Sequence, residues 1–517
     1  MIRSSLHSSG ASDPLWLDRH PRQPGPSLTR DAAADVCVVG GGIAGLTTAY
    51  LLAEAGRSVA LLEDGMIGSG ETGRTTAHLS DVLDDRFQEL ERLHGADGAR
   101  LAFESHHAAI AEIERLATTL KIACAFERLP GYLFPAAGGE GRLEEEFEAA
   151  RRAGHRSARL LSSSPLPSWA ARRCIEFPDQ AQFDPIAYLT GLAEAFVDAG
   201  GRLFERTRME SIEEEEEEVV VRTGGGHAVR AQAAVIATNA PVTSPVSVPL
   251  RQAAYRTYAA ALPLAPGLRR ALWWDMEDPY HYVRLHETLD GRAFLIVGGE
   301  DHKTGQGDDP DERWKRLADW ARERFPGAGE PAYRWSGQVM EPVDGLAFIG
   351  RQSKDGRIYI ATGDSGHGMT HGTIAGLLLR DLVQGGSHPW AELYDPHRLR
   401  WKSIPELLRE NANVVPRYGD WLTPGEIPGT ADLPVGQGAV VREGLRKVAC
   451  YRDEKGLLHA FSARCPHLGC IVRWNGAEKT WDCPCHGSRF TCFGRVVNGP
   501  ANADLEPTDL RQEAVGE

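Results

Sequence analysis

The sequence lacks an apolar run long enough to cross a bilayer. No stretch approaches the ~18 consecutive apolar residues that a membrane-spanning helix requires, and the opening residues, "MIRSSLHSSGASDPLW", lack the apolar core of a secretory signal. Basic residues are also in deficit, with 57 Lys and Arg against 72 Asp and Glu and a formal net charge of −15. Such a surface repels phosphate backbones, which argues against nucleic acid as a partner. We therefore expect a cytoplasmic protein with no membrane span.

Cysteine is scarce over most of the chain and concentrated near its end. Cys37, Cys124 and Cys174 lie far apart, and we expect them to be ordinary buried thiols. The other six cysteines all fall between Cys450 and Cys492. In a cytoplasmic chain, cysteines clustered with histidines indicate a metal site more than a disulfide scaffold.

The 517 residues predict about three domains, at roughly 150 residues each. Residues 1–34 are rich in Ser, Pro and Arg, and we expect a loose N-terminal segment. Helical and strand patterns alternate through residues 35–390, and the Pro-containing stretch 391–432 predicts a linker. Short strands broken by Gly, Asp and Lys turns predict an all-β module over 433–517. The acidic run Glu213–Glu218 is expected to form a solvated hairpin turn.

A dinucleotide-binding pattern opens the folded part of the chain. In "DVCVVGGGIAGL" an apolar strand precedes Gly40, Gly42 and Gly45, and a helical run follows. Gly40 permits a tight turn, Gly42 the approach of backbone to a pyrophosphate, and Gly45 the packing of helix on strand. Free N–H groups at the helix start suit the phosphates. Glu63 ends the next strand, 18 residues beyond Gly45, and is placed to accept hydrogen bonds from a ribose. The alternative is a plain glycine turn.

Three later segments extend this pattern: "GSGETGRTTAHLS", "AAVIATNA", and "DGLAFIG" with the following "RIYIATGDSGHGMTHGTIAGLLLRDLV". Together with the glycine turn they resemble the FAD-dependent amine and amino-acid oxidoreductases that include glycine oxidase, sarcosine oxidase and D-amino acid oxidase. The resemblance covers roughly residues 35–385 and implies an α/β FAD-binding domain with an inserted mixed-sheet substrate domain, about 85–205 and 245–335. It also implies further FAD contacts, which are Arg74, Thr75, Thr76, Gly363, Gly366, Gly368 and Met369.

The chain departs from that family at two places. Some members link the flavin covalently to a His at about the position of Arg74, or to a Cys in the second half of the domain, and this chain has no cysteine between residues 174 and 450. We therefore expect non-covalent FAD. Members that oxidise amino acids often hold the substrate carboxylate with an Arg near the position of Gln338. A simple α-amino acid is thus disfavoured as the substrate. Arg256 or Arg284 is left to supply the positive charge that a substrate carboxylate would need.

Aromatic residues are dense between Arg251 and Gly299, the part expected to cover the substrate site. Such rings either form a cage for an alkylammonium group or fill the strands of a mixed sheet. A period of two in "PYHYVRL" places Tyr280, Tyr282 and Arg284 on one strand face. These three are the candidate pocket residues, and the catalytic residues stay unknown.

The clustered cysteines lie in two similar loops, "CPHLGC" and "CPCHGS". The first contributes Cys465 and His467; fifteen residues later the second contributes Cys483 and His486. Two thiolates and two imidazoles are the ligands of a Rieske [2Fe–2S] centre, with both imidazoles on one iron. A zinc site is the alternative, because Cys and His at short spacing also suit Zn²⁺.

The two loops resemble the Rieske signature, and the resemblance covers about residues 433–506. It implies a C-terminal all-β Rieske domain whose [2Fe–2S] cluster is held by the two Cys–His pairs. It also implies a disulfide between the remaining loop cysteines, Cys470 and Cys485, and a hydrogen bond from Ser488 to a cluster sulfur.

Together the two resemblances predict an oxidoreductase that oxidises a C–N bond of a small amine-like substrate. FAD would pass the electrons to the Rieske cluster, and the cluster to an external acceptor. In the alternative, the flavin half is an oxidase or binding protein and the Rieske module a redox sensor or docking domain. A cluster held at the flavin favours electron transfer, and a loose module favours sensing or docking. We expect the two cofactor sites to lie in separate domains, so that loss of one leaves the other intact.

Overall fold

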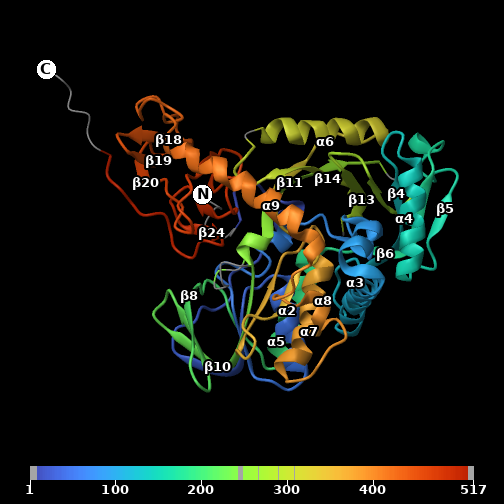
Figure 1. Ribbon diagram of the computed structural model, residues 1–517, viewed down its shortest axis with the longest axis horizontal. Helices are drawn as coiled ribbons and strands as arrows, with labels where there is room; N and C mark the ends of the chain where they lie inside the picture. Colours follow the sequence, from blue (N-terminus) through green and yellow to red (C-terminus); the bar gives the residue numbers. More distant parts are fainter. Residues whose placement is uncertain are drawn as a thin grey trace.

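The computed structural model describes residues 9–510 except 241, 243–247, 266, 289 and 308. Within these residues the chain forms two large sheets, which build the body of the molecule, and two small sheets near the C-terminus (Figure 1). The outer parts of the predicted first and last segments, 1–8 and 511–517, lie outside the described residues.

The first large sheet is the expected dinucleotide-binding sheet. Its strands run in the order β16-β17-β10-β1-β2-β7, with β9 and β8 continuing from β10. Their bounds are β1 Ala32–Val39, β2 Val59–Leu62, β7 Arg202–Phe204, β8 Met209–Glu214, β9 Val219–Thr223, β10 Ala228–Asn239, β16 Phe348–Arg351 and β17 Ile358–Thr362. β1 pairs in parallel with both β2 and β10, as in doubly wound folds. The antiparallel pair β8–β9 is the hairpin expected around the glutamate run.

Helices α2 (Ile43–Glu54) and α7 (Gly368–Val383) pack together in the same layer as α5 (Pro185–Asp198) (Figure 1). The contact between α2 and α7 is close because α7 presents glycine to its neighbour. A Cβ at Gly372 would stand 2.6 Å from Ile43 Cγ2. This packing brings the starts of both helices, each preceded by a glycine-rich turn, to one edge of the sheet.

The second large sheet is mixed, as expected for a substrate domain, because β12 pairs with β4 in parallel and its other pairs are antiparallel. Its order is β15-β11-β14-β13-β12-β4-β6-β3, with β5 beside β6. The bounds are β3 His78–Leu79, β4 Glu127–Phe134, β5 Arg159–Leu161, β6 Cys174–Gln182, β11 Gln252–Pro263, β12 Leu272–Asp275, β13 His281–Glu287, β14 Ala293–Lys303 and β15 Tyr333–Pro342. Helix α6 (Pro310–Arg324) covers β11 and β14, and α4 (Glu140–Ala153) packs on α3 (Arg86–Thr119) (Figure 1).

Within the described part of the N-terminal segment, the stretch around Leu15–Arg19 is packed against the body, which corrects the expectation that it is loose. Helix α1 (Leu15–Arg19) buries Leu15 and Trp16 completely. The indole N–H of Trp16 donates to the Thr75 carbonyl at 2.7 Å, and its ring meets His286 edge-on at 4.8 Å between centroids. Composition alone suggested disorder, but one buried indole provides a large apolar contact and a hydrogen bond.

The connecting segment 391–432 contains more helix than a linker was expected to have. It holds α8 (Ala391–Tyr394), α9 (Ile404–Val414) and a 3₁₀ stretch, Val415–Trp421. Helix α9 runs from the body to the C-terminal sheets (Figure 1). The connection is therefore a helical strap, which restricts the position of the last domain more than a flexible tether would.

The C-terminal domain is all-β, as expected. One sheet contains β18 (Gly438–Glu443), β19 (Arg446–Arg452) and β20 (Leu458–Ser462), and the other contains β21 (Arg473–Asn475), β22 (Thr480–Asp482), β23 (Arg489–Thr491) and β24 (Val496–Asn498). The domain begins before residue 433, because Glu426 and Val440 exchange hydrogen bonds of 2.7 and 2.8 Å. Across the described ranges, no helix combines the length and apolar character needed to cross a membrane.

Replacing Trp16 by alanine should lower the free energy of unfolding by about 3–5 kcal/mol, the usual cost of truncating a buried tryptophan. The urea midpoint, followed by far-UV circular dichroism, should fall accordingly. Trp401→Ala is the matched control, because that side chain is 74% exposed. Equal midpoints for the two variants would show that the N-terminal segment does not contribute to stability.

Candidate functional site

A cavity of about 590 Å³ lies at the carboxyl ends of the parallel strands. Its walls include the ends of β1, β2, β10 and β17 and reach across to β11 and β15 of the second sheet. The volume is within the range of roughly 300–1,000 Å³ that is usual for ligand and cofactor sites. The carboxyl edge of a doubly wound sheet is also where such folds bind their ligands.

The turn between β1 and α2 requires glycine at two positions. Gly40 has φ +108°, and a Cβ there would stand 2.3 Å from the Ala237 carbonyl oxygen. A Cβ at Gly45 would stand 1.9 Å from the Gly40 oxygen, so Gly45 serves the packing of α2 and does not line the cavity. Gly42, the N-cap of α2, faces the cavity with Thr72 Oγ1 as its nearest obstacle at 3.1 Å.

Glu63 and Thr72 complete this turn. The Glu63 carboxylate accepts hydrogen bonds from the N–H groups of Gly41, at 2.7 Å, and Gly65, at 2.9 Å. Burial, reinforced by the nearby Asp64, raises the pKa of Glu63 well above its usual value. Thr72 accepts from the N–H of Ile43 at 3.1 Å, at the first residue of α2. Thr72 was not among the FAD contacts implied by the resemblance, although it lies in the segment "GSGETGRTT" that carries part of it.

The second glycine-rich turn forms another wall. Gly363 and Gly366 have φ of +79° and +75°, which only glycine adopts without strain. A Cβ at Gly366 would stand 2.6 Å from Asp84 Oδ2. The predicted cofactor residues that line the cavity are Gly40, Gly42, Glu63, Arg74, Thr75, Thr76, Gly363, Gly366, Gly368 and Met369.

Arg74 lines the cavity, but its guanidinium is directed toward the C-terminal domain. Nη1 donates to the Ser336 carbonyl at 2.8 Å and lies 3.3 Å from a Glu478 carboxylate oxygen. Nη2 donates to the Gly10 carbonyl at 2.8 Å. The guanidinium of this predicted FAD-binding residue thus takes part in an interdomain ion pair.

Of the three candidate pocket residues, the structure places two in the cavity lining and one outside it. Tyr280 and Tyr282 line the cavity and stack at 5.8 Å between ring centroids. Arg284 lies further along β13, outside the lining, with Nη2 donating to the Phe183 carbonyl at 3.0 Å and its guanidinium 5.0 Å above the Trp16 ring. The period of two was correct for the strand, but the N-terminal helix occupies the space next to Arg284.

Arg256, the other arginine considered for a substrate carboxylate, is also bound elsewhere. Arg256 is fully buried and pairs with Glu478 at 3.3 Å. Neither Arg256 nor Arg284 is therefore available for a substrate carboxylate. The aromatic residues divide between the two predicted roles: Trp274 lines the cavity, whereas Trp273 stacks on Tyr132 inside the core at 4.8 Å.

Two histidines and an aspartate that line the cavity with Tyr280 and Tyr282 were not singled out from the sequence. His78 lies 5.3 Å from Tyr282 between centroids, and its Nε2 is buried with no hydrogen-bond partner among the residues the structure describes. Burial lowers the pKa of His78 to about 3. Nε2 of His367 accepts from the Asp84 N–H at 3.0 Å. Burial opposes protonation of His367, but the Asp84 carboxylate outweighs it and raises the pKa of His367.

Acidic groups surround the same end of the cavity. Tyr280 donates to Asp301 at 3.1 Å, and Ser365 donates to Asp85 at 3.4 Å. Burial raises the pKa of both carboxyls to about 6. It also raises the pKa of Asp364, which lines the cavity, to about 7. In their ionised form, these carboxyls favour a cationic ligand over an anionic one in this part of the cavity.

The two metal-binding loops bring the four predicted ligands together. The rings of His467 and His486 stand 5.0 Å apart at 89°. Both ring nitrogens of His486 are buried, and neither has a hydrogen-bond partner in the part of the chain that the structure describes. A buried imidazole in this state is costly unless a metal takes one of its nitrogens. Burial lowers the pKa of His486 to about 4, which keeps the ring in the neutral form that binds metal.

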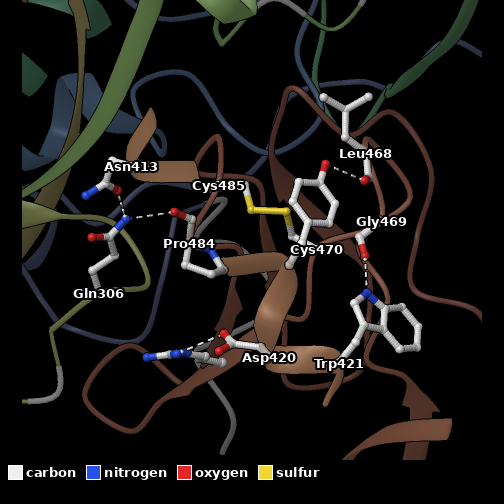
Figure 2. Close-up of a disulfide and its surroundings, with 11 residues drawn as sticks. Gln306, Asn413, Asp420, Trp421, Leu468, Gly469, Cys470, Pro484 and Cys485 are labelled. Carbon is white, nitrogen blue, oxygen red and sulfur yellow. Dashed lines mark hydrogen bonds and ion pairs between the residues drawn. A yellow bond between two sulfur atoms is a disulfide. The ribbon is translucent and has the colours of Figure 1, made fainter. Parts of the chain in front are cut away.

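The loop cysteines fall into two pairs. Cys465 and Cys483 are free and buried, and their mutual hydrogen bond lowers the pKa of Cys465. Cys470 and Cys485 form a disulfide with their Cα atoms 6.5 Å apart, which joins the two loops (Figure 2). The Cys483 sulfur lies within 4.8 Å of both disulfide sulfurs. This donor set fits a [2Fe–2S] cluster, and the disulfide accounts for two cysteines that a zinc site would leave unused.

Contacts from outside the small sheets hold both loops. Gln306, which follows β14, donates to the Pro484 carbonyl at 3.0 Å, and Trp421 of the strap donates to the Gly469 carbonyl at 3.1 Å (Figure 2). Gln338 of β15 donates to the Gly487 carbonyl at 2.9 Å. Gln338 also lines the cavity, so one residue borders both candidate sites.

The two sites belong to separate domains, as expected, but the C-terminal domain also borders the flavin cavity. Residues of the C-terminal domain also line the cavity; they are Val496, Val497, Asn498, Gly499, Ala501 and Asn502. Sequence reasoning missed them because no local signal distinguishes this stretch from other short strands and turns.

A dinucleotide turn at a sheet edge, a second glycine turn opposite it and a Cys₂His₂ pair of loops define a flavin-dependent, iron–sulfur oxidoreductase. The chain belongs to the family described as FAD dependent oxidoreductase (DAO), which it matches over residues 35–382, and it carries a Rieske [2Fe-2S] domain over residues 425–509. Its cofactors are accordingly FAD and a [2Fe–2S] cluster, and the residues described above fit both.

Two curated relatives and one solved structure show the range of the likeness. The chain is 32% identical over 493 residues to the putative Rieske 2Fe-2S iron-sulfur protein YhfW of Bacillus subtilis, covering 94% of this chain and 95% of the relative. It is 30% identical over 380 residues to gamma-glutamylputrescine oxidoreductase of Escherichia coli, covering 70% and 86%. Glycine oxidase from Geobacillus kaustophilus shares the fold, with a TM-score of 0.60 and 21% identity over 71% of this chain and 99% of that one.

Acid or heat should release the flavin from the polypeptide. The residues that line the cavity include no cysteine, and Arg74 stands where some relatives carry the linking histidine. After precipitation with trichloroacetic acid, the supernatant should be yellow and the pellet colourless. Yellow colour that stays with the pellet would indicate a covalent bond, for which the cavity histidines would be the next candidates.

His467→Ala and His486→Ala should each remove the cluster, because each takes away one of its two imidazole ligands. The wild-type protein should contain about two irons and two acid-labile sulfides per chain. His459→Ala is the matched control: this histidine lies in the same domain but pairs with Asp453 at 3.0 Å. Stoichiometric zinc in protein prepared without oxygen would contradict the assignment.

Proposed function

We propose that the protein is a dehydrogenase that oxidises a C–N bond of a small cationic amine and passes the electrons to its Rieske cluster and on to an external acceptor. FAD, when bound, supplies two-electron oxidation of the substrate and one-electron transfer to the cluster. The chain's own residues orient the amine, exclude water and hold the two cofactor sites together. The contact of Gln338 with the cluster-binding loop is the observation that carries the proposal.

Gln338 supports electron transfer between the two sites. Its side chain is 1% exposed, and its backbone N–H donates to Glu71 in the segment that precedes Arg74, at 2.7 Å. On the other side its Nε2 reaches the carbonyl of Gly487, the residue directly after the ligand His486. The wall of the flavin cavity and the cluster loop therefore share one buried residue. With Gln306 on Pro484, this fixed contact favours an electron path over a loosely attached sensor.

The chemistry of the cavity supports an amine substrate. Tyr280, Tyr282 and Trp274 offer ring faces to an alkylammonium group. Asp84 and Asp364 in the lining favour positive charge, while Arg256 and Arg284 are directed away. Neither of the two arginines considered for a free α-carboxylate is therefore placed to bind one. The relative from Escherichia coli, named for gamma-glutamylputrescine, is in keeping with an amine donor.

The two cluster histidines differ in exposure, which supports an external acceptor. His486 is buried beside the flavin domain, whereas His467 is only partly buried and precedes Leu468, which is 39% exposed. Electrons would thus enter on the side of His486 and leave on the side of His467. Such a route gives the enzyme an outlet other than oxygen.

Gln338→Leu should slow reduction of the cluster and leave reduction of the flavin unchanged. In stopped-flow mixing with an amine that bleaches the flavin, the later cluster signal should slow by about tenfold, the change that 1.4 kcal/mol of barrier produces. Gln306→Leu is the matched control, because it loses a hydrogen bond to the same loop but does not line the cavity.

The His486→Ala variant, which lacks the cluster, tests the proposal as a whole. It should still bleach its flavin with substrate but turn over slowly with a one-electron acceptor. If it matches the wild type in turnover, and both release peroxide in proportion to the amine consumed, the cluster is off the electron path. The protein would then be an oxidase with a sensing or docking module.

A further inference from the structure

The C-terminal domain contributes one wall of the flavin cavity, formed by residues 496–502 at the end of β24 and just beyond it. Within this stretch, residues 496–499, 501 and 502 face the same space as the glycine turn at Gly40–Gly42. We call residues 496–502 the covering segment. It belongs to the Rieske domain in sequence but to the FAD site in space.

The flavin domain contacts the covering segment at Asn498 and Gly499, at the Asn502 carbonyl through Arg208 (3.5 Å), and just beyond the segment at Asp504. Asn498 donates to Glu71 at 3.4 Å. Arg208, which lines the cavity at the end of the first sheet, donates to Asp504 at 3.1 Å. Between them, a Cβ at Gly499 would stand 2.9 Å from Val242 Cγ1. These contacts seat the segment closely against the flavin domain.

The covering segment is also tied to the cluster-binding loop. The N–H of Ala501 donates to Ser488 Oγ at 3.0 Å, and Ser488 ends the loop that carries Cys483 and His486. Arg489, the next residue, donates to Asn498 Oδ1 at 3.3 Å. Segment and loop therefore belong to one packed unit, so that access to the cavity on this side depends on where the whole domain sits.

A buried ion cluster fixes the position of that domain. Glu478, on the turn before β22, is 1% exposed and lies 3.3 Å from both Arg74 and Arg256 of the flavin domain. Ser12 of the N-terminal segment donates to the same carboxylate at 2.6 Å. Removing the negative charge would leave two guanidinium groups buried without their counter-ion, which is strongly unfavourable in the docked arrangement.

We propose that the Rieske domain is the cover of the FAD site, and that FAD leaves or enters on this side only when the domain undocks from its Glu478 anchor. The inference concerns cofactor retention and does not depend on electron transfer between the sites. FAD affinity is then a property of two domains, and weakening the anchor shortens the residence time of the flavin.

Release of FAD from oxidised protein, without substrate, tests this proposal. Free flavin fluoresces more strongly than bound flavin, so its release after dilution is followed as a rise in fluorescence. Glu478→Gln should release FAD at least about tenfold faster than the wild type, since a loss of 1.4 kcal/mol corresponds to a factor of ten. The matched control is Glu454→Gln, an exposed glutamate of the same domain, which should release FAD at the wild-type rate.

A second variant keeps the test decisive. The electron paramagnetic resonance signal of the reduced cluster reports whether the Rieske domain remains folded in each protein. If Glu478→Gln loses that signal, Asn498→Ala decides, because it removes the segment's bonds to Glu71 and Arg489 but leaves the pairs of Glu478 with Arg74 and Arg256 in place. Faster release from a variant with an intact cluster supports the proposal. Wild-type release rates from variants with intact clusters would overturn it.

Discussion

The architecture depends on one buried carboxylate. Glu478 comes from the last domain, and its partners Arg74, Arg256 and Ser12 come from three other parts of the chain. Burial alone would raise the pKa of this carboxyl, but the guanidinium groups around it lower that pKa to about 2. The group is therefore charged under all ordinary conditions. Charges buried in this way are tolerated only when their partners stay in place, which makes the interdomain geometry close to all-or-none.

Other features follow from this constraint. The part of the N-terminal segment around Ser12 and Trp16 is packed on the body because Ser12 joins the ion cluster and Trp16 joins the core. Helix α9 of the strap buries none of its residues, and this is tolerated because other contacts also attach the C-terminal domain to the body. The cluster loop meets the cavity wall at Gln338 because Ser336, two residues earlier on the same strand, already contacts Glu478. The ion pairs of Glu478 thus fix how the two cofactor sites are positioned relative to each other.

Features with local causes were predictable from the sequence. Gly40 and Gly45 are required by atoms of their own turn or of the adjacent strand, and the two Cys–His loops carry their ligands within a few residues. The fold class and the cofactors followed from these patterns. What could not be predicted depends on partners far away in sequence. Arg74 occupies a cofactor segment but pairs with a residue 404 positions later. Arg284 keeps its predicted strand face, yet an N-terminal helix that composition assigned to disorder lies against it.

Because the covering segment lies late in the sequence, the parts of the FAD site are synthesised in a fixed order. A ribosome delivers the glycine turn at residues 40–45 first and the second turn at 363–368 much later, and both precede residues 496–502. Domains generally fold as they emerge, starting from the N-terminus. The nascent flavin domain therefore presents its cofactor cradle before the last wall has been synthesised. A flavin bound during this interval would meet an open cradle, which the iron–sulfur domain would then close.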